Sequence, residues 1–306
     1  MKVILSSQMR RELQTLVAQP VAWEVPLAAH TSLRIGGPAE ALVTVEDCAE
    51  LASVLSFARR QAVPWRLLGK GSNVLVADDG LAGITLMLGG GFRRLEKIGD
   101  REVAAGAASV LPALSRFCQE NGLSGLEFAA GIPGSVGGAV VMNAGAFGGQ
   151  IAAWVSALEL CGEDGPRMLP ASELRFAYRA WLDAEKWRGQ VAITGVHFIL
   201  RQDDPAAIAA RMEEYQRARR LGQPHGATSA GSFFKNPPGD SAGRLIDTCG
   251  LKGLRVGDAM VSPAHANFLV NIGQATAADV RELARLVREA VHRRHGVDLE
   301  QEVEEW

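Results

Sequence analysis

The stretch Ala130–Gly149 reads AGIPGSVGGAVVMNAGAFGG, and seven of its twenty residues are glycine. It has no charged side chain, and its polar side chains are those of Ser135 and Asn143. Because glycine destabilises helices and strands, such a cluster indicates backbone that lies close to another group. A flat, extended ligand held by backbone N–H and C=O groups would require this composition. From composition alone, a packed glycine-rich turn explains the stretch equally well.

A second glycine loop, Gly69–Asn73 (GKGSN), favours the ligand interpretation. The apolar runs on either side of it, Pro64–Leu68 and Val74–Ala77, read as strands. Small residues between two strands leave consecutive N–H groups facing one concavity, which suits a phosphate, although a tight hairpin uses the same residues. The spacing matches neither a Walker A loop nor the Rossmann fingerprint. A nucleotide bound here is therefore bound in another way.

Size and composition limit the possible classes of protein. A chain of 306 residues predicts two or three domains, and 47% hydrophobic with 22% charged residues is typical of a soluble globular protein. A net charge of −2 favours neither nucleic acid nor anionic lipid as a partner. The first residues, MKVILSSQMRRELQ, do not form a signal peptide, and no stretch reaches the length of a membrane span. We expect no membrane insertion; the oligomeric state stays open.

Cysteine and histidine usage points to a reduced environment without a metal. The four cysteines are far apart and form no CxxC motif, which favours a cytoplasmic location with each thiol in a core. Of the six histidines, His292 and His295 have helical spacing, but they lie on a charged helix where solvent is the better expectation. We therefore predict no metal site.

Element patterns divide the chain into three regions. The first has a helix from Ser7 to about Gln19, a strand Ala41–Val45 and a helix capped by Asp47. Short strands dominate from Pro64 to about Gln202, with one helix around Val110–Glu120, so we expect a mixed sheet.

In the third region, Asp204 and Pro205 open a helix that Gly222 ends. A strand at Asn267–Ile272 and a long helix follow; Thr276 and Asp279 can form its capping box, and Gly296 ends it. The predicted domains are residues 1–63, an N-terminal lobe; 64–203, a second lobe; and 204–306, a C-terminal domain.

Ser232 and Arg179 are candidate functional residues. Ser232 lies in GSFFKNP without a Ser-His-Asp or GxSxG arrangement, so it is not an acyl-transfer nucleophile. Its hydroxyl can instead donate a proton to a basic carbanion, whereas an ordinary strand serine is the simpler interpretation. Arg179 follows Tyr178, and an arginine fork beside a tyrosine suits a carboxylate or phosphate. A surface arginine is equally plausible.

The acidic tail and an arginine cluster are weaker candidates. In a strand, Glu300 and Glu302 share one face, so one carboxylate could lie in a cleft. A solvated acidic tail is the better interpretation from the sequence alone. Arg217, Arg219 and Arg220 suit a diphosphate, but a solvated helix end explains them equally well.

Seven segments in order resemble one enzyme family: HTSLRIGG, LGKGSNVLV, GLEFAAGIPGSVGGAVVMNAGAFGG, FAYR, SAGSFFKNP, AGRLIDTCGLKGLRVGDAMVSPAHANFLVN and LEQEV. The chain is similar to UDP-N-acetylenolpyruvoylglucosamine reductases from about His30 to Val303, in their shorter form that lacks an extra substrate loop. The resemblance implies an α+β protein, with a FAD-binding fold of the vanillyl-alcohol-oxidase (PCMH) type and a C-terminal α+β substrate domain. Members of the family make UDP-N-acetylmuramate for peptidoglycan, with NADPH as co-substrate.

The resemblance also implies residue roles. In the family mechanism, NADPH reduces FAD and leaves, and the enolpyruvyl ether of the UDP-sugar then takes the hydride. Arg179 and Glu302 would stabilise the resulting enol-like intermediate, and Ser232 would donate the proton. Tyr178, Arg219, Arg220, Lys235 and Asn236 would contact the substrate. Non-covalent FAD would be bound by Arg34, Gly69, Lys70, Gly71, Ser72, Asn73, Gly131, Ile132, Pro133, Gly134, Ser135, Gly138 and Asn143.

One position departs from the family pattern, since Trp181 stands where a serine is usual. Two other functions remain open at this point. The first is an oxidase of alcohols or lactones on the same flavin fold, and the second is a non-catalytic flavin- or nucleotide-binding regulator.

Overall fold

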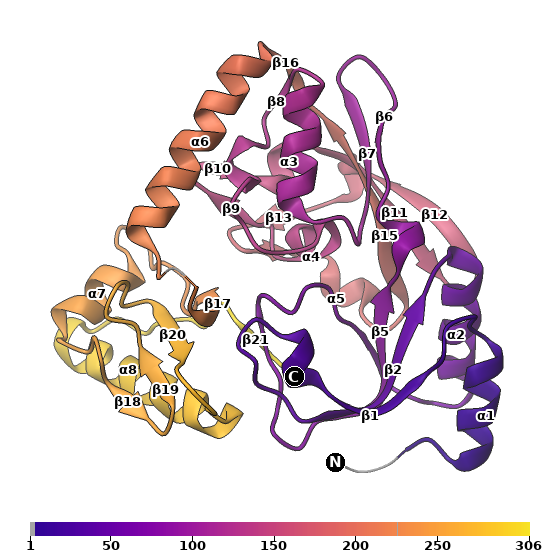
Figure 1. Cartoon of the computed structure of the whole chain (residues 1–306), viewed down its shortest axis with the longest axis horizontal. Helices are drawn as coiled ribbons and strands as arrows, with labels where there is room; N and C mark the ends of the chain where they lie inside the picture. Colours follow the sequence, from indigo (N-terminus) through magenta and orange to yellow (C-terminus); the bar gives the residue numbers. More distant parts are fainter. Residues whose placement is uncertain (1–3, 225) are drawn as a thin grey trace.

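A computed structural model describes residues 4–224 and 226–306 of the chain. Figure 1 shows a larger part made of the first two-thirds of the sequence, a long helix α6 leading away from it, and a smaller C-terminal part. The last strand, β21 (Glu304–Glu305), returns from the smaller part to the larger one, where it pairs in parallel with β4 (Val74–Leu75).

The first sheet has four strands in the order β1-β2-β5-β3, which are Ala22–Pro26, Pro38–Val45, Leu81–Leu88 and Trp65–Leu67. Strands β2 and β3 both run parallel to β5, and β1 is antiparallel to β2. Helices α1 (Ser7–Thr15) and α2 (Cys48–Arg60) contribute apolar side chains to the core beside this sheet. Asp47 caps α2 as predicted, because its carboxylate accepts from the backbone N–H groups of Ala49 and Glu50.

This sheet bears on the domain boundary, since β3 and β5 lie beyond residue 63 and still belong to it. A division at residues 63–64 cuts one hydrogen-bonded sheet. We therefore propose that the first lobe extends to Leu88, the end of β5.

The second sheet is wholly antiparallel, in the order β12-β11-β15-β7-β6. Its strands are Gly165–Pro170, Val155–Gly162, Val191–Ile199, Glu102–Gly106 and Leu95–Lys97. Helices α3 (Leu111–Glu120) and α4 (Val136–Val141) share its apolar core, and the predicted helix at Val110–Glu120 is confirmed within one residue. The short helix α4 lies inside the glycine-rich stretch and is capped by the Ser135 hydroxyl.

Small ladders and short helices complete the larger part. The paired strands are β8 (Leu123–Ser124) with β16 (Arg201–Gln202), β9 (Gly145–Ala146) with β10 (Gly149–Gln150), and β13 (Phe176–Ala177) with β14 (Ala180–Trp181). The short helices are α5 (Ala184–Trp187) and the 3-10 turns Leu27–His30, Gly90–Phe92, Glu127–Ala129, Ile151–Ala153 and Ala171–Glu173.

The C-terminal part has a third sheet in the order β17-β20-β19-β18, with helices α7 (Ala242–Thr248) and α8 (Ala277–His295). Its strands are Thr228–Ser232, Phe268–Asn271, Ala259–Val261 and Arg255–Val256. Both predicted ends of α8 are confirmed: Thr276 and Asp279 form the capping box, and Gly296 adopts a left-handed φ of 67°.

Helix α6 (Pro205–Gly222) connects the two parts and begins at the predicted cap, Asp204. Its Arg211 donates two hydrogen bonds to Glu127 Oε1, at 3.1 and 2.9 Å, and a third to Asp203. Glu127 also accepts from Ser124 Oγ and from the Gly125 N–H. Burial raises the pKa of Glu127, but its backbone, Arg211, Ser124 and Gly125 hydrogen bonds outweigh this and lower it below the ordinary 4.5.

Replacing Glu127 by alanine is expected to lower the free energy of unfolding by about 2–3 kcal/mol, because it leaves buried donors unpaired. A carboxyl whose folded pKa is depressed stabilises the protein above the unfolded pKa and loses this as the pH falls through the folded value. The difference from wild type should therefore shrink at acid pH. Denaturant unfolding at pH 7 and below pH 4 measures it. The control Glu213→Ala, in an exposed α6 ion pair, should change stability by less than about 0.5 kcal/mol.

Candidate active site

The two glycine loops lie against each other. A Cβ placed on Gly69 would lie 2.5 Å from Ser135 Oγ, and one on Gly134 would lie 3.5 Å from Ser72 Oγ. The two loops are therefore in contact although they are about sixty residues apart in the sequence. A side chain at Gly69 would fill the space between them.

The backbone of these loops is free to bind an anion. Within residues 4–224 and 226–306, no N–H group from Gly69 to Asn73 donates a hydrogen bond, and neither do those of Gly131 and Gly134. Unpaired N–H groups on two loops that lie against each other can form a nest that suits a phosphate. Lys70, Gly69 and Pro133 are exposed at this place. These features fit the diphosphate of FAD.

Gly71 is held by the HTSLRIGG segment. Its φ is 59°, and a Cβ on it would overlap the backbone carbonyl oxygen of His30. The Ser32 N–H donates to the Gly71 carbonyl at 2.9 Å. Arg34, two residues further on, also has a positive φ, 52°, and an exposed side chain. The segment HTSLRIGG thus packs against the loop Gly69–Asn73 and holds its backbone. No motif spacing in the sequence predicts this contact.

Arg179 and Glu302 form an ion pair although they are far apart in the sequence. Arg179 Nε lies 3.0 Å from Glu302 Oε1, and the two side chains are 21% and 16% exposed. The solvated-tail interpretation is therefore wrong for Glu302. Burial raises the pKa of Glu302 above its ordinary 4.5, and the charges of Arg179 and Lys235 oppose this only in part. This carboxyl is therefore harder to ionise than an exposed glutamate.

The conformation of Arg179 is strained. Its φ is 58°, in the left-handed region that non-glycine residues rarely adopt, and such backbone strain is concentrated at functional sites. Its Nη2 donates to the Gly145 carbonyl at 2.9 Å, so the glycine-rich stretch also holds this guanidinium. The Tyr178 ring lies 4.9 Å from the Arg179 Cζ and is 49% exposed.

Ser232 ends β17, where a bulge between Ser229 and Ser232 interrupts the pairing with β20. Bulges redirect side chains next to active sites. The Glu302 N–H donates to the Phe233 carbonyl at 2.8 Å, so the Ser232 strand and the Glu302 segment run side by side. The structure thus brings Ser232, Glu302 and Arg179 to one region.

The other predicted substrate contacts differ in position. Arg219 is half-buried against Gly131, whose added Cβ would lie 2.9 Å from Arg219 Cδ, and desolvation lowers its pKa. Arg220 is exposed. Lys235 pairs with Glu300, and Asn236 Oδ1 accepts from the Ala242 N–H at 3.0 Å. Arg219 is therefore the member of its cluster that faces the glycine loops.

Asn143 is buried and hydrogen-bonded. Its side chain is 1% exposed. Nδ2 donates to the Ala177 carbonyl at 2.9 Å and to Gln150 Oε1 at 3.3 Å, and Oδ1 accepts from the Ala152 N–H at 3.0 Å. The side chain of Asn143 is thus engaged in hydrogen bonds within the protein, and its role in FAD binding stays a prediction. Ser135 Oγ accepts from the Gly138 N–H, while Gly138 itself is exposed and Ile132 is partly buried.

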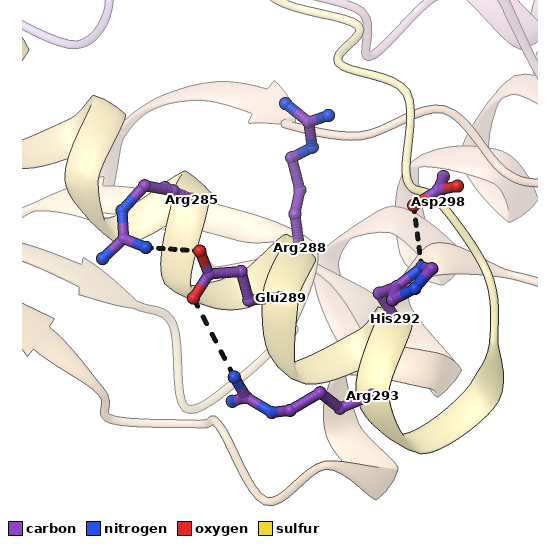
Figure 2. Close-up of a pocket in the computed structure, with 6 residues that line it drawn as sticks. All are labelled: Arg285, Arg288, Glu289, His292, Arg293 and Asp298. Carbon is purple, nitrogen blue, oxygen red and sulfur yellow. Dashed lines mark hydrogen bonds and ion pairs between the residues drawn. The ribbon is translucent and has the colours of Figure 1, made fainter.

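Two hollows lie elsewhere and contain none of the predicted residues. The first, of about 380 Å³, is lined by side chains of α8 and by Asp298, and Figure 2 shows the charged side chains other than Arg288 pairing with one another. Glu289 is paired with Arg285 and Arg293, and His292 with Asp298 at 2.9 Å. The second, of about 670 Å³, lies between the end of α2 and the β11–β12 hairpin.

The described residues show no helix long and apolar enough to cross a membrane. They also show no group of three or more histidine, cysteine, aspartate or glutamate side chains arranged to hold a metal ion.

Comparisons with known proteins agree with this geometry. A model described as "FAD binding domain" matches residues 39–167, and one described as "UDP-N-acetylenolpyruvoylglucosamine reductase, C-terminal domain" matches residues 223–306. These matches confirm the predicted fold class, a PCMH-type FAD-binding fold followed by a C-terminal α+β domain.

Relatives match over nearly the whole chain. A protein of Symbiobacterium thermophilum named UDP-N-acetylenolpyruvoylglucosamine reductase 2 is 47% identical, covering 98% of this chain and 97% of the relative. A reductase of the same name from Moorella thermoacetica is 46% identical, covering 96% of each. The crystal structure of UDP-N-acetylenolpyruvylglucosamine reductase from Thermus caldophilus has a TM-score of 0.81 and 44% identity, covering 94% of this chain and 98% of that one.

These relatives confirm the resemblance carried by the seven motifs. The chain belongs to the UDP-N-acetylenolpyruvoylglucosamine reductase family of FAD-binding oxidoreductases.

Proposed function

We propose that this protein reduces UDP-N-acetylglucosamine enolpyruvate to UDP-N-acetylmuramate in the cytoplasm, with NADPH as reductant and FAD as cofactor, for peptidoglycan synthesis. The observation that carries the proposal is the Arg179–Glu302 ion pair, which lies beside the Ser232 strand. The enolpyruvyl group carries a carboxylate that the Arg179 guanidinium can bind, whereas a simple alcohol substrate carries none.

FAD, when bound, supplies hydride transfer from NADPH to the terminal carbon of the enolpyruvyl double bond. The N–H groups of Gly69–Asn73, Gly131 and Gly134, which donate no hydrogen bond among the described residues, would hold its diphosphate. Backbone donors bind the phosphates without adding buried charge.

The protein's own side chains complete the reduction. Arg179 is suited to bind the substrate carboxylate through its fork, and Glu302, whose pKa is raised by burial, would donate a hydrogen bond to the same group when it is protonated. Charge that develops next to the carboxylate is stabilised there. Ser232 Oγ then gives its proton to the carbon that carries the ether oxygen, so that one hydride and one proton add across the double bond.

Further side chains near Arg179, Glu302 and Ser232 are proposed to bind the substrate. Tyr178, Lys235 and Asn236 are proposed contacts, and Arg219 is the proposed partner of the UDP diphosphate because it is desolvated and has a single hydrogen-bond partner, Gln223, among the described residues. Arg220, which is exposed, is the weaker choice.

The test is NADPH oxidation by FAD-loaded protein with UDP-N-acetylglucosamine enolpyruvate under anaerobic conditions. Stoichiometric formation of UDP-N-acetylmuramate is the expected result. Turnover that needs oxygen and an alcohol would establish an oxidase instead, and flavin binding without any turnover would establish a regulator.

Gly71→Ala is expected to weaken FAD binding about tenfold or more. Alanine at φ 59° is strained, and its Cβ overlaps the His30 carbonyl oxygen, so the loop must move. Titration of apoprotein with FAD, followed by flavin fluorescence, measures the dissociation constant. The matched control is Gly165→Ala in the β11–β12 hairpin, where φ is 94° but nothing lies within 4 Å of the added Cβ. Equal loss in both variants would contradict the role of the loop.

A further inference from the structure

We propose that three asparagine side chains are positioning residues, which set the geometry of the candidate catalytic side chains through hydrogen bonds to nearby backbone. They are Asn73, Asn143 and Asn267. The inference rests on the proposed function, since it concerns the same three catalytic side chains. The asparagines come from three different segments, and each binds the backbone beside a different catalytic side chain.

Asn73 holds the Glu302 segment. Its Nδ2 donates to the Glu302 carbonyl at 3.0 Å, and its own carbonyl accepts from the Glu304 N–H at 3.0 Å. Beyond this point, β21 (Glu304–Glu305) runs parallel to β4 (Val74–Leu75), and the Trp306 N–H donates to the Leu75 carbonyl at 3.0 Å. The loop proposed to bind FAD is thus the same loop that locates Glu302.

Asn143 holds the Arg179 segment. Its Nδ2 bond to the Ala177 carbonyl lies two residues before Arg179. Arg179 has a left-handed φ of 58°, which only surrounding contacts can maintain. Asn143 also has a positive φ, 40°, that asparagine tolerates better than most residues. Its buried amide therefore stabilises a turn that would otherwise relax.

Asn267 holds the Ser232 segment and was not among the residues predicted from the sequence. Its side chain, 2% exposed, pairs with both backbone groups of Phe234: Nδ2 donates to the carbonyl at 2.8 Å and Oδ1 accepts from the N–H at 2.9 Å. The Asn267 carbonyl accepts from the Phe233 N–H at 2.8 Å. These bonds fix the backbone just after the bulge that ends at Ser232.

An asparagine suits this role for a physical reason. Its amide is uncharged, directional and short, so it can bond to a carbonyl across elements without adding a charge to the active site. The bonds link positions 229, 34 and 33 residues apart. Because a displacement of about 1 Å can cost about 100-fold in rate, losing such a bond should affect the chemical step more than binding.

The experiment measures the two half-reactions separately in FAD-loaded Asn73→Ala, Asn143→Gly and Asn267→Ala. Flavin reoxidation by the enolpyruvyl substrate should slow about tenfold or more in all three variants. Flavin reduction by NADPH should stay within about twofold of wild type, and so should the FAD dissociation constant of Asn143→Gly and Asn267→Ala. Asn73→Ala is compared at saturating FAD, because its residue belongs to the loop proposed to bind FAD. The control is Asn121→Ala, which loses a bond to the Phe117 carbonyl at the end of α3, away from the site. It should leave both half-reactions unchanged.

A double-mutant cycle tests whether Asn73 acts through Glu302. If it does, Asn73→Ala should add nothing to the loss in Glu302→Ala. Losses that multiply, or normal reoxidation in all three variants, would overturn the inference. If Glu302→Ala itself reoxidises at the wild-type rate, the proposed function fails instead. Asn143→Gly keeps the positive φ accessible, so the inference stays testable if another variant fails to fold.

Discussion

Ser232→Ala is expected to lower turnover about 100-fold or more while the FAD is still reduced by NADPH. The hydroxyl is the proposed proton source, and Ser232 lies at the end of the bulge that begins at Ser229. Alanine removes the proton but keeps the backbone, so cofactor binding and the first half-reaction have no reason to change. Rapid mixing of reduced enzyme with the substrate, followed by flavin absorbance, measures the step that should fail.

The matched control for this variant is Ser229→Ala. Ser229 lies on the same strand across the bulge, and its hydroxyl accepts only a long bond, 3.5 Å, from the Gly231 N–H. Its loss should leave turnover near that of wild type. Full activity of Ser232→Ala would show that water or another group supplies the proton.

Arg179→Ala should reduce the rate of flavin reoxidation by substrate at least as strongly, about 100-fold or more, and should also raise KM. The guanidinium is the proposed partner of the substrate carboxylate and lies 3.0 Å from Glu302. Without this guanidinium, no cation from Arg179 stabilises the negative charge that develops on the substrate carboxylate. The control is Arg175→Ala. Arg175 precedes Arg179 by four residues, is exposed and pairs with Asp183. Its loss should leave both half-reactions unchanged.

The effect of Arg179→Ala on the free energy of unfolding should depend on pH. Burial already raises the pKa of Glu302 above 4.5, and Arg179 opposes that rise, so its removal should raise this pKa further. A carboxyl with a raised folded pKa favours folding when protonated and becomes unfavourable as the pH rises above the unfolded value. The loss of unfolding free energy in Arg179→Ala should therefore be larger at pH 8 than below pH 4.5. An equal loss at both would contradict the coupling.

Local sequence signals determined much of the fold. The caps Asp47, Asp204 and Thr276, and the stop at Gly296, act on backbone groups within a few residues, so they were visible without tertiary information. The glycine-rich loops were equally visible, because glycine clusters mark close approach wherever they fold. Ordered motifs also identified the family, and thereby the candidate roles of Arg179, Ser232 and Glu302.

Only the tertiary structure decided how these pieces meet. The sequence favoured a solvated tail for Glu302, since nothing nearby in the chain reveals that Arg179 lies 3.0 Å away. The two loops face each other through contacts between distant segments, and β3 and β5 join the first sheet across the predicted lobe boundary. The buried hydrogen bonds of Asn143 and Asn267 likewise have no local pattern. Capping and turn preferences depend on short-range backbone geometry, whereas burial, ion pairs and strand partners depend on long-range packing, which one sequence does not display.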